Sequence, residues 1–341
     1  MSRRFIFFRH LIGTSFLWFI IVSCTFAGNY DEKFRHQVDT EKRFTVKEGQ
    51  SLILDSDLGT VTIVGTSGNE VIIKVTKGAN RVSEDRAEEM FDRFELDFRQ
   101  TGSGVEVYGE YDRPGFWRSS FWSKLKVVYD IRIPEDFDLD IVTSGGSINV
   151  EQVAGEITLR TSGGSLNLYD VDGPVIAKTS GGSVTAKKVS GREVYLKTSG
   201  GSIRVTECEG SIECSTSGGS ITADGVSGSL DAHTSGGSIR LNNISGEIDA
   251  TTSGGGIKTE LIGQPKGPIS LKTSGGSVTL YMDDDVKAEI DARTSGGRVN
   301  VDFPVTVRGK FSKSQLRGEV NGGGPMILLR TSGGGIHIQR R

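Results

Sequence analysis

The sequence has few of the residues on which metal centres, redox sites and many catalytic sites depend. It has three cysteines in 341 residues and no C-x-x-C pair, which excludes zinc-ribbon and thioredoxin-like motifs. The four histidines, His10, His36, His233 and His337, lie far apart in the sequence. There is no G-x-S-x-G elbow, and no Walker-type loop follows a strand. We therefore expect no catalytic residue, no cofactor-binding residue and a protein that is not an enzyme.

One acidic run, residues 283–285, is a candidate for metal binding because calcium prefers carboxylate oxygens. The calcium-binding nonapeptide G-G-x-G-x-D is absent, so we expect a solvated turn and no metal ligand. The chain also lacks an excess of one charge, with 40 basic and 43 acidic residues and a net charge of −3. Nucleic-acid binders normally carry a basic excess on one face, so this balance argues against a nucleic-acid partner.

The chain also lacks a convincing membrane span. Its apolar segment, Leu11–Val22, is too short and follows a basic start, "MSRRFIFFRH", which is typical of an export signal over residues 1–27. Two cleavage sites remain open: "IVSC" resembles a bacterial lipobox and would leave a lipidated Cys24, whereas "TFA" before Gly28 suits ordinary signal peptidase. Either site predicts an exported protein of the periplasm, outer membrane or cell surface, attached to the membrane only through its signal or a lipid anchor.

Glycine, by contrast, is abundant, with 47 residues in 341. Much of it belongs to the tetrapeptide TSGG, which occurs ten times and is followed seven times by serine. Most intervals between copies are 18 or 19 residues, two are 21 and the last is 37, close to two periods. We expect one of those two periods to be degenerate, around Ser312–Leu316. The threonines of TSGG are residues 143, 161, 179, 198, 216, 234, 252, 273, 294 and 331.

Within each period, apolar residues alternate with polar ones over two short segments, as in half-buried strands. A glycine separates the two strands, and SGG separates one period from the next. Because neither strand can bury its apolar face alone, the periods must stack into a continuous core. Apolar residues do not recur every six residues, which excludes the left-handed hexapeptide helix. The pattern therefore predicts an all-β, parallel, right-handed β-solenoid over residues 143–341 with about 18 residues per coil.

The same alternation places the threonine of TSGG inside the coil, where stacked hydroxyls can form an internal ladder of hydrogen bonds. The two glycines are expected to supply positive φ angles and room for close backbone approach, and the serine to bond within the turn. A surface ladder of Thr and Ser, as on an ice-binding face, is the alternative. The motif is thus interpreted as structural.

Residues 29–142 differ from the repeat. They alternate as strands except for "SEDRAEEMFDRFEL", which predicts a short helix capped by Ser83 with an apolar stripe ending at Phe94. An open solenoid end exposes unpaired backbone groups, so this region is expected to cap the stack. At the other end, "IHIQRR" is expected to close the stack with charged residues.

The segments "GTVTIVG", "YDIRIPEDFDLDIVTSGGSINVEQVAGEI" and the repeated "TSGGS" resemble the bacterial putative-adhesin family of β-strand repeats, a domain of unknown function. The resemblance covers nearly everything after the signal. It implies an exported or envelope-linked β-solenoid and transfers no catalytic residues. We therefore interpret the protein as a non-enzymatic scaffold or adhesin-like binding module whose partner is an envelope polysaccharide or another envelope protein. The alternative is a carbohydrate-active enzyme, of polysaccharide lyase or hydrolase type, on a parallel β-helix.

Two surfaces are candidate contact sites. Counting along the coils places one basic strip on a solvent-facing sheet, formed by Arg160, Ile176, Lys178, Tyr195 and Lys197. Three cations spaced by about 4.8 Å can follow a polyanion, and Tyr195 can stack on a sugar ring. Stacked like charges repel, so the charged columns on this sheet should also contain compensating pairs.

The second surface is the loop "RPGFWRSSFWSKLK", which gathers Phe116, Trp117, Phe121 and Trp122. It is either a hydrophobic plug that packs on the solenoid end or a contact loop for a membrane, glycan or protein.

Cys208 and Cys214 take apolar positions on different parts of one coil. They are therefore expected to be buried free thiols, too far apart for a disulfide.

Overall fold

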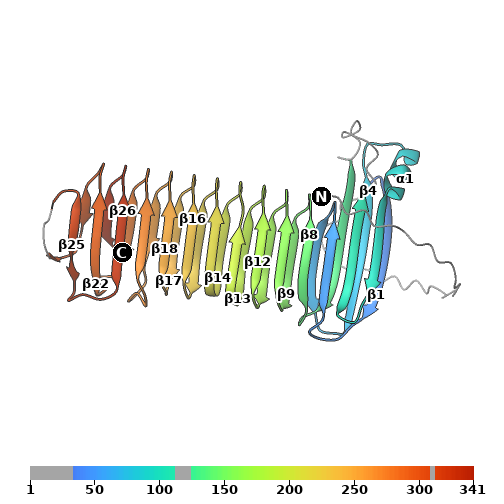
Figure 1. The fold of residues 1–341 in the computed structure, drawn as a ribbon, viewed down its shortest axis with the longest axis horizontal. Coiled ribbons are helices and arrows are strands. Elements are labelled where there is room, and N and C mark those ends of the chain that lie inside the picture. The colour runs from blue at the N-terminus through green and yellow to red at the C-terminus, as the bar shows by residue number, and fades with distance from the viewer. Residues whose placement is uncertain (1–33, 112–123, 308–311) are drawn as a thin grey trace, which may run out of the picture. The chain divides into compact units, whose positions relative to one another are not determined.

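A computed structural model describes residues 34–111, 124–307 and 312–341. Residues 34–341 form one compact unit (Figure 1), in which parallel strands stack coil upon coil. Within the described residues, the regular structure is strand apart from a single helix, and that helix is neither long nor apolar enough to cross a bilayer. The predicted all-β class and the parallel solenoid are confirmed.

Two parallel sheets form the coils. Sheet 1 contains β8 (Asp138–Thr143), β10 (Ile157–Thr161), β12 (Val175–Thr179), β16 (Leu230–Thr234), β18 (Ile248–Thr252), β20 (Ile269–Thr273), β22 (Ala288–Thr294) and β26 (Met326–Thr331). Sheet 2 contains β9 (Ile148–Ala154), β11 (Leu166–Asp172), β15 (Ile221–Ser227), β17 (Ile239–Ile244), β19 (Ile257–Glu260), β21 (Val278–Met282), β23 (Val299–Val301) and β27 (Ile336–Arg340). Two longer strands, β13 (Val184–Lys197) and β14 (Ile203–Thr216), pass through both sheets.

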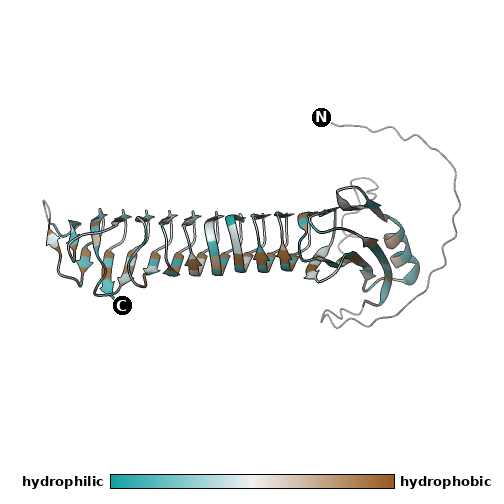
Figure 2. Ribbon diagram, turned by 90° about the horizontal axis from the view of Figure 1, so that it is seen from below, coloured by the Kyte–Doolittle hydropathy of each residue, from teal (hydrophilic) through white to brown (hydrophobic). Residues whose placement is uncertain are grey.

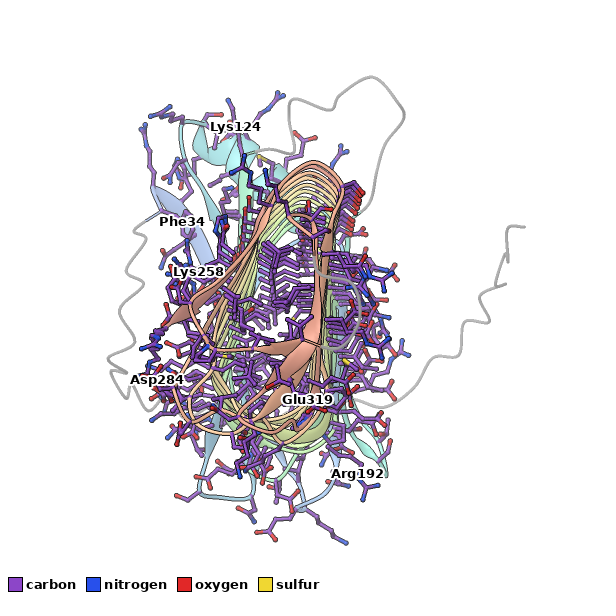
Figure 3. All side chains as sticks on the ribbon, turned by 90° about the vertical axis from the view of Figure 1, so that its left-hand side faces the viewer. Phe34, Lys124, Arg192, Lys258, Asp284 and Glu319 are labelled. Carbon is purple, nitrogen blue, oxygen red and sulfur yellow. The ribbon has the colours of Figure 1, made fainter. Side chains whose placement is uncertain are left out.

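The core lies between the two sheets. Each strand turns alternate residues inward, and these are aliphatic in coil after coil, as in Ile157, Leu159 and their partners Val175 and Ala177. Brown apolar bands recur along the strands in Figure 2. Figure 3, which looks along the stack, shows the interior filled by side chains and the nitrogen and oxygen tips turned outward. Neighbouring coils therefore bury one another, as a repeat this short requires.

The predicted threonine ladder is confirmed. The TSGG threonines are all buried, and each hydroxyl donates to a glycine carbonyl of a neighbouring turn. Thr234 is typical, because its Oγ1 lies 2.8 Å from Gly219 O and accepts the Gly237 N–H at 3.3 Å. Each hydroxyl thus links two turns and satisfies backbone groups that the corner leaves without a ladder partner.

The glycines of TSGG act differently from the expectation. None has a positive φ; positive values occur instead at the glycines between the two strands of a coil, such as Gly155 and Gly173. The second glycine of TSGG instead allows the backbones of neighbouring turns to approach closely, because a Cβ on Gly164 would lie 2.0 Å from Gly146 O. The first glycine, Gly163, has only ordinary contacts at 3.8 Å.

A column of left-handed residues bends the sheet 2 segments of the first six coils, and sequence inspection missed it. Gln152, Asp170, Lys188, Glu207 and Asn243 have φ between 53° and 58°. Each stands nine residues after the TSGG threonine of its coil, where the fifth coil has Gly225. Short or flexible polar residues tolerate this conformation better than β-branched ones, which agrees with the column's composition.

The N-terminal end broadens and adds the antiparallel pairs β1–β4, β4–β7 and β5–β6 to the parallel stack. It contains β1 (His36–Thr45), β2 (Ser51–Ser56), β3 (Thr60–Thr66), β4 (Glu70–Ala79), α1 (Glu84–Asp92), β5 (Phe94–Gln100), β6 (Gly104–Tyr111) and β7 (Leu125–Pro134). The pairs β2–β8 and β3–β9 join it directly to the coils, while β1 and β5 are the outermost described strands of the two sheets.

The predicted helix is present as α1, and its Ala87, Met90 and Phe91 are buried. Two details differ from the expectation. Ser83 occupies the N-cap position without a side-chain capping bond, and Phe94 belongs to β5 rather than to the helix.

The C-terminal end is not built in chain order. β26 pairs with β20 on one side and with β22 on the other, and β27 lies in the same way between β21 and β23. The last segment of the chain is therefore inserted between two coils that precede it. Beyond it, β24 (Thr306–Val307) and β25 (Gln315–Val320) form an antiparallel cover on β22.

Two sequence expectations are wrong here. The 37-residue interval contains this antiparallel cover instead of a degenerate coil, and "IHIQRR" lies inside the stack instead of closing it. Local alternation is the same wherever a coil stands in the stack, so it carries no information about coil order.

Candidate functional site

The structure brings the predicted basic strip together on sheet 1. Arg160, Lys178 and Lys197 are register partners on the adjacent strands β10, β12 and β13, and all three side chains are exposed. Ile176 and Tyr195 are register partners two residues earlier on β12 and β13. The five residues thus form one surface on three consecutive coils, which is called the basic strip below.

The cations of the basic strip are incompletely neutralised. Arg160 pairs with Asp140 at 3.1 Å, and the Lys178 ammonium lies 5.0 Å from the centre of the Tyr195 ring. Within the described residues, neither Lys178 nor Lys197 has an ion-pair partner in reach, so the strip keeps a local positive charge. Ile176, with 36% of its surface exposed, adds an apolar element beside the Tyr195 ring.

Farther along sheet 1, the column that contains Ile176 and Tyr195 becomes acidic. Glu213, Asp231 and Asp249 stack on β14, β16 and β18, and compensating partners accompany two of them. His233 Nε2 contacts the Asp231 carboxylate, and Lys272 Nζ lies 3.6 Å from Asp249. Partial burial raises the pKa of the Asp231 carboxyl above its usual range, and His233 acts in the opposite direction. This pattern is the expected charge compensation of a solvated face.

The acidic run at residues 283–285 is also engaged by neighbouring groups. Asp283 Oδ2 accepts a hydrogen bond from the Gly263 N–H at 3.0 Å, and Arg341 approaches its other oxygen at 3.6 Å. Arg340 pairs with Asp284 at 3.3 Å. Among the residues that the structure describes, no group of three or more His, Cys, Asp or Glu side chains could hold a metal ion.

Both cysteines of the repeat are free and buried, as expected. Cys208 is the register partner of Val226, and Cys214 lies between Leu196 and Ala232. Burial raises the pKa of both thiols, so the reactive thiolate is disfavoured and they behave as small apolar side chains.

The remaining candidates lie outside the described residues. They are the export segment at residues 1–27, including Cys24, and the contact loop with Phe116, Trp117, Phe121 and Trp122.

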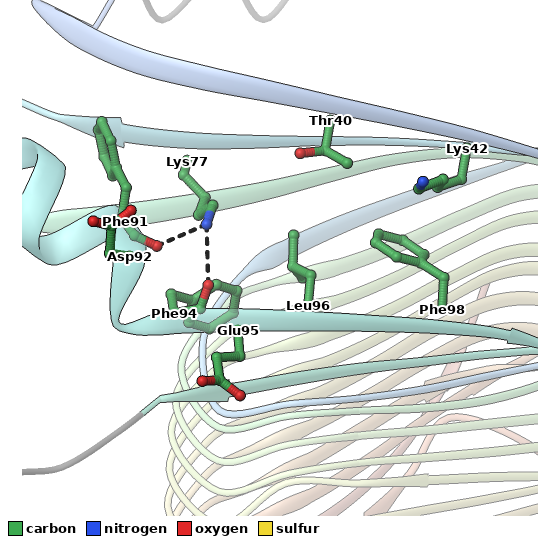
Figure 4. Close-up of a pocket in the computed structure, with 9 residues that line it drawn as sticks. All are labelled: Thr40, Lys42, Lys77, Phe91, Asp92, Phe94, Glu95, Leu96 and Phe98. Carbon is green, nitrogen blue, oxygen red and sulfur yellow. Dashed lines mark hydrogen bonds between the residues drawn. The ribbon is translucent and has the colours of Figure 1, made fainter. Parts of the chain in front are cut away.

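A cavity of about 630 Å³ opens at the N-terminal end, between β1, β5 and α1 (Figure 4). Phe91, Phe94, Leu96 and Phe98 give it an apolar side. Lys77 crosses it from β4, and its ammonium donates to Phe91 O at 2.7 Å and to Phe94 O at 3.0 Å. The lysine thereby ties sheet 2 to the end of the helix and to the edge of sheet 1.

Lys77 has a structural role that sequence inspection missed. Partial burial lowers the pKa of its ammonium, against the opposing effect of nearby Asp92. Both acceptors of the Lys77 ammonium are backbone carbonyls of this chain, so this charged group stabilises the fold. The sequence contains one indication of this role, because Lys77 falls on the same alternation as Val71, Ile73 and Val75, which are all buried.

Comparison with solved structures gives only distant likenesses. A protein from Parabacteroides merdae described as a putative adhesin is 9% identical and has a TM-score of 0.38, with 89% of this chain and 96% of that chain covered. One from Bacteroides fragilis, also described as a putative adhesin, is 10% identical with a TM-score of 0.28 and coverage of 89% and 97%. One from Parabacteroides distasonis described as a putative lipid binding protein is 11% identical with a TM-score of 0.28 and coverage of 89% and 96%.

At these scores the structural likenesses say nothing about function. The search of the curated proteins finds no match. The family model described as Toastrack DUF4097 matches residues 39–339, nearly the whole of the described chain. This match confirms the resemblance carried by the TSGGS repeats, and the chain belongs to the Toastrack DUF4097 family.

Proposed function

We propose that this protein is an exported, non-enzymatic β-solenoid of the cell envelope that binds an acidic polysaccharide along the basic strip. The observation that carries the proposal is the register of Arg160, Lys178 and Lys197 on three consecutive coils. The coils repeat at about 4.8 Å, which is close enough for one flexible polyanion to contact all three cations. Tyr195 and Ile176 lie beside them and offer a flat, apolar surface to a sugar ring.

Electrostatics supports a polyanion as the ligand. Two unit charges about 4 Å apart in water repel by about 1 kcal/mol, so stacked cations weaken the free protein slightly. A bound polyanion would remove this repulsion and add attraction. The Lys178 ammonium is already held over the Tyr195 ring, which limits the side-chain entropy lost on binding.

The test is a triple substitution, Arg160→Gln, Lys178→Gln and Lys197→Gln. We expect it to abolish binding of polygalacturonate at low salt without lowering the urea midpoint, because these side chains point away from the core. Neutral dextran serves as the uncharged probe. In the unsubstituted protein, binding should weaken steeply between 20 and 200 mM salt, since exposed charges are screened over about 8 Å at physiological salt.

A second triple variant controls for the loss of three charges. Lys47, Lys266 and Lys313 are exposed and lie far apart in the sequence, so their replacement by glutamine changes net charge equally without touching the basic strip. This variant should retain most of the binding. If the strip variant binds polygalacturonate as well as the unsubstituted protein does, the strip is only a solvated surface.

Export and anchoring belong to the same proposal. The basic and apolar start of the chain and the "IVSC" segment support export, and lipidation at Cys24 would place the solenoid at a membrane surface. Mass spectrometry of the mature N-terminus from the native host tests this. A diacylglyceryl-modified Cys24 is the expected result, and an unmodified chain beginning at Gly28 would contradict lipidation while leaving export intact.

A further inference from the structure

A second column of side chains, on sheet 2, is formed by the serines that follow TSGG. In most coils the serine Oγ accepts the backbone N–H of the equivalent residue in the next coil. Ser220 Oγ, for example, accepts the Ser238 N–H at 3.2 Å. The other links of this ladder join Ser147 to Ser165, Ser165 to Ser183, Ser183 to Ser202, Ser202 to Ser220, and Ser277 to Gly335.

Glycine interrupts this column twice, with different results. At Gly335 the vacated space is occupied, because His337 Nε2 lies 3.0 Å from where a Cβ would stand. Asn300 holds the His337 ring through Nδ1 at 3.3 Å. At Gly256 no side chain enters, and the nearest atom to a Cβ position is the backbone Ser277 O at 3.0 Å. No side chain therefore fills the space beside Gly256, which the Ser277 carbonyl borders on one side.

This space is part of a groove of about 330 Å³ along sheet 2. Arg240 and Lys258, register partners on β17 and β19, line it together with Thr279, Ser238 and Ser277. The groove is called the Gly256 notch below. Lys258 lies on the outside of the coil in Figure 3. Two cations from adjacent coils thus border a gap edged by hydroxyl groups.

Hydrogen-bond donors in the notch lack partners. In the other coils the serine N–H is bonded to the preceding serine hydroxyl, but Gly256 offers none to Ser277. Within residues 34–111, 124–307 and 312–341, the Ser277 N–H donates no hydrogen bond, and its nitrogen is 3.7 Å from the vacant Cβ position. Arg240 likewise forms no ion pair in this part of the chain.

Lys258 is oriented by an ion pair and an aromatic ring. Its ammonium lies 3.2 Å from Glu260 and 4.8 Å from the centre of the Tyr281 ring. Glu260 and Tyr281 are register partners on β19 and β21 and stand two residues beyond the notch-lining pair Lys258 and Thr279. The notch therefore combines a free guanidinium, an oriented ammonium, an unpartnered amide and nearby hydroxyls, which together suit a negatively charged oxygen group.

We propose that the Gly256 notch binds one oxyanion, the carboxylate or sulfate group of an acidic saccharide. Arg240 and Lys258 neutralise its charge, and the Ser277 N–H donates to one of its oxygens. The site lies on sheet 2, whereas the basic strip lies on sheet 1, so the notch is a separate site and does not depend on polymer binding at the strip.

The test uses the purified protein at low ionic strength with three probes: inorganic sulfate, glucuronate and uncharged methyl glucoside. We expect sulfate and glucuronate to shift the Ser277 amide resonance saturably, and methyl glucoside to leave it unchanged. Gly256→Ser restores the column residue of the other coils and fills the notch. It should weaken anion binding at least about tenfold, the loss expected for a charge-assisted hydrogen bond.

Urea denaturation of the same variants distinguishes an effect on folding from an effect on anion binding. Gly256→Ser gives the Ser277 N–H an acceptor, so the urea midpoint should stay equal or rise, although the coil must shift by a few tenths of an ångström to admit the Cβ. Arg240→Gln leaves the backbone untouched and should also weaken binding about tenfold. The matched control is Gly335→Ser, next to the space that His337 already fills, and it should bind as the unsubstituted protein does.

Three results would overturn the proposal: a Ser277 amide that does not move with either anion, sulfate binding unchanged in both Gly256→Ser and Arg240→Gln, or an equal response to methyl glucoside. The basic-strip triple variant should keep the full Ser277 response. Loss of that response would show that the anion binds at the strip rather than in the notch. The two proposals can therefore fail separately.

Discussion

Gly201→Ala is expected to destabilise the protein by about 3 kcal/mol, whereas Gly200→Ala should change its stability by less than about 1 kcal/mol. The two substitutions add the same methyl group to neighbouring residues of one TSGG turn. The Cβ on Gly201 would lie 2.1 Å from the carbonyl oxygen of Gly182 in the preceding coil. On Gly200, the nearest atoms would lie at 3.5 Å, an ordinary van der Waals contact.

The difference arises because the clash at Gly201 is with backbone, which cannot rotate away as a side chain can. Relieving it would require the two coils to separate, which would lengthen the bond from Thr198 Oγ1 to Gly182 O. Urea denaturation followed by circular dichroism measures both variants. Equal midpoints for Gly200→Ala and Gly201→Ala would mean that close packing of the turns does not require the second glycine.

Deletion of residues 325–341 should unfold more of the chain than the segment it removes. The deletion takes away β26 and β27, through which β22 and β23 are joined to the preceding coils. We expect amide protection to be lost over residues 283–324 as well, while β8 to β18 keep theirs. Hydrogen exchange detected by mass spectrometry gives the result segment by segment.

The strictly sequential stack makes the opposite prediction. In that arrangement β22 and β23 would lie directly on β20 and β21, and loss of the final coil would leave them protected. Protection retained over residues 288–301 in the deletion variant would therefore contradict the prediction that β22 and β23 depend on the inserted coil. A matched control is Leu230→Ala in the middle of the stack, which should leave protection at residues 288–301 unchanged.

Much of the solenoid could be predicted because its determinants are local and repeated. The period of TSGG, the alternation around Ile157 and Leu159, and the inward position of Thr161 all follow from strand geometry within one coil. The basic strip could be placed for the same reason, since equivalent positions in successive coils must stack. The buried free thiols followed from the same register.

The features that could not be predicted depend on contacts between segments far apart in the sequence. Every coil has the same internal pattern, so nothing local shows that β26 inserts between β20 and β22. The role of Lys77 depends on carbonyls of α1 and β5 that only the fold brings near it. Gly256 and Gly335 both replace the serine of the repeat, and only the fold shows that His337 enters the space at Gly335 whereas no side chain enters the space at Gly256.

The inserted C-terminal coil affects how the molecule would bear mechanical load. A terminal coil has one neighbour, so tension on its free end peels its hydrogen bonds away one after another. Here β27 is bonded to β21 on one side and to β23 on the other. A pull along this strand loads both ladders in shear, so many bonds must break together. In a sequential stack the terminal coil would detach most easily under tension. Because β27 lies between two other strands, this coil instead resists mechanical extraction.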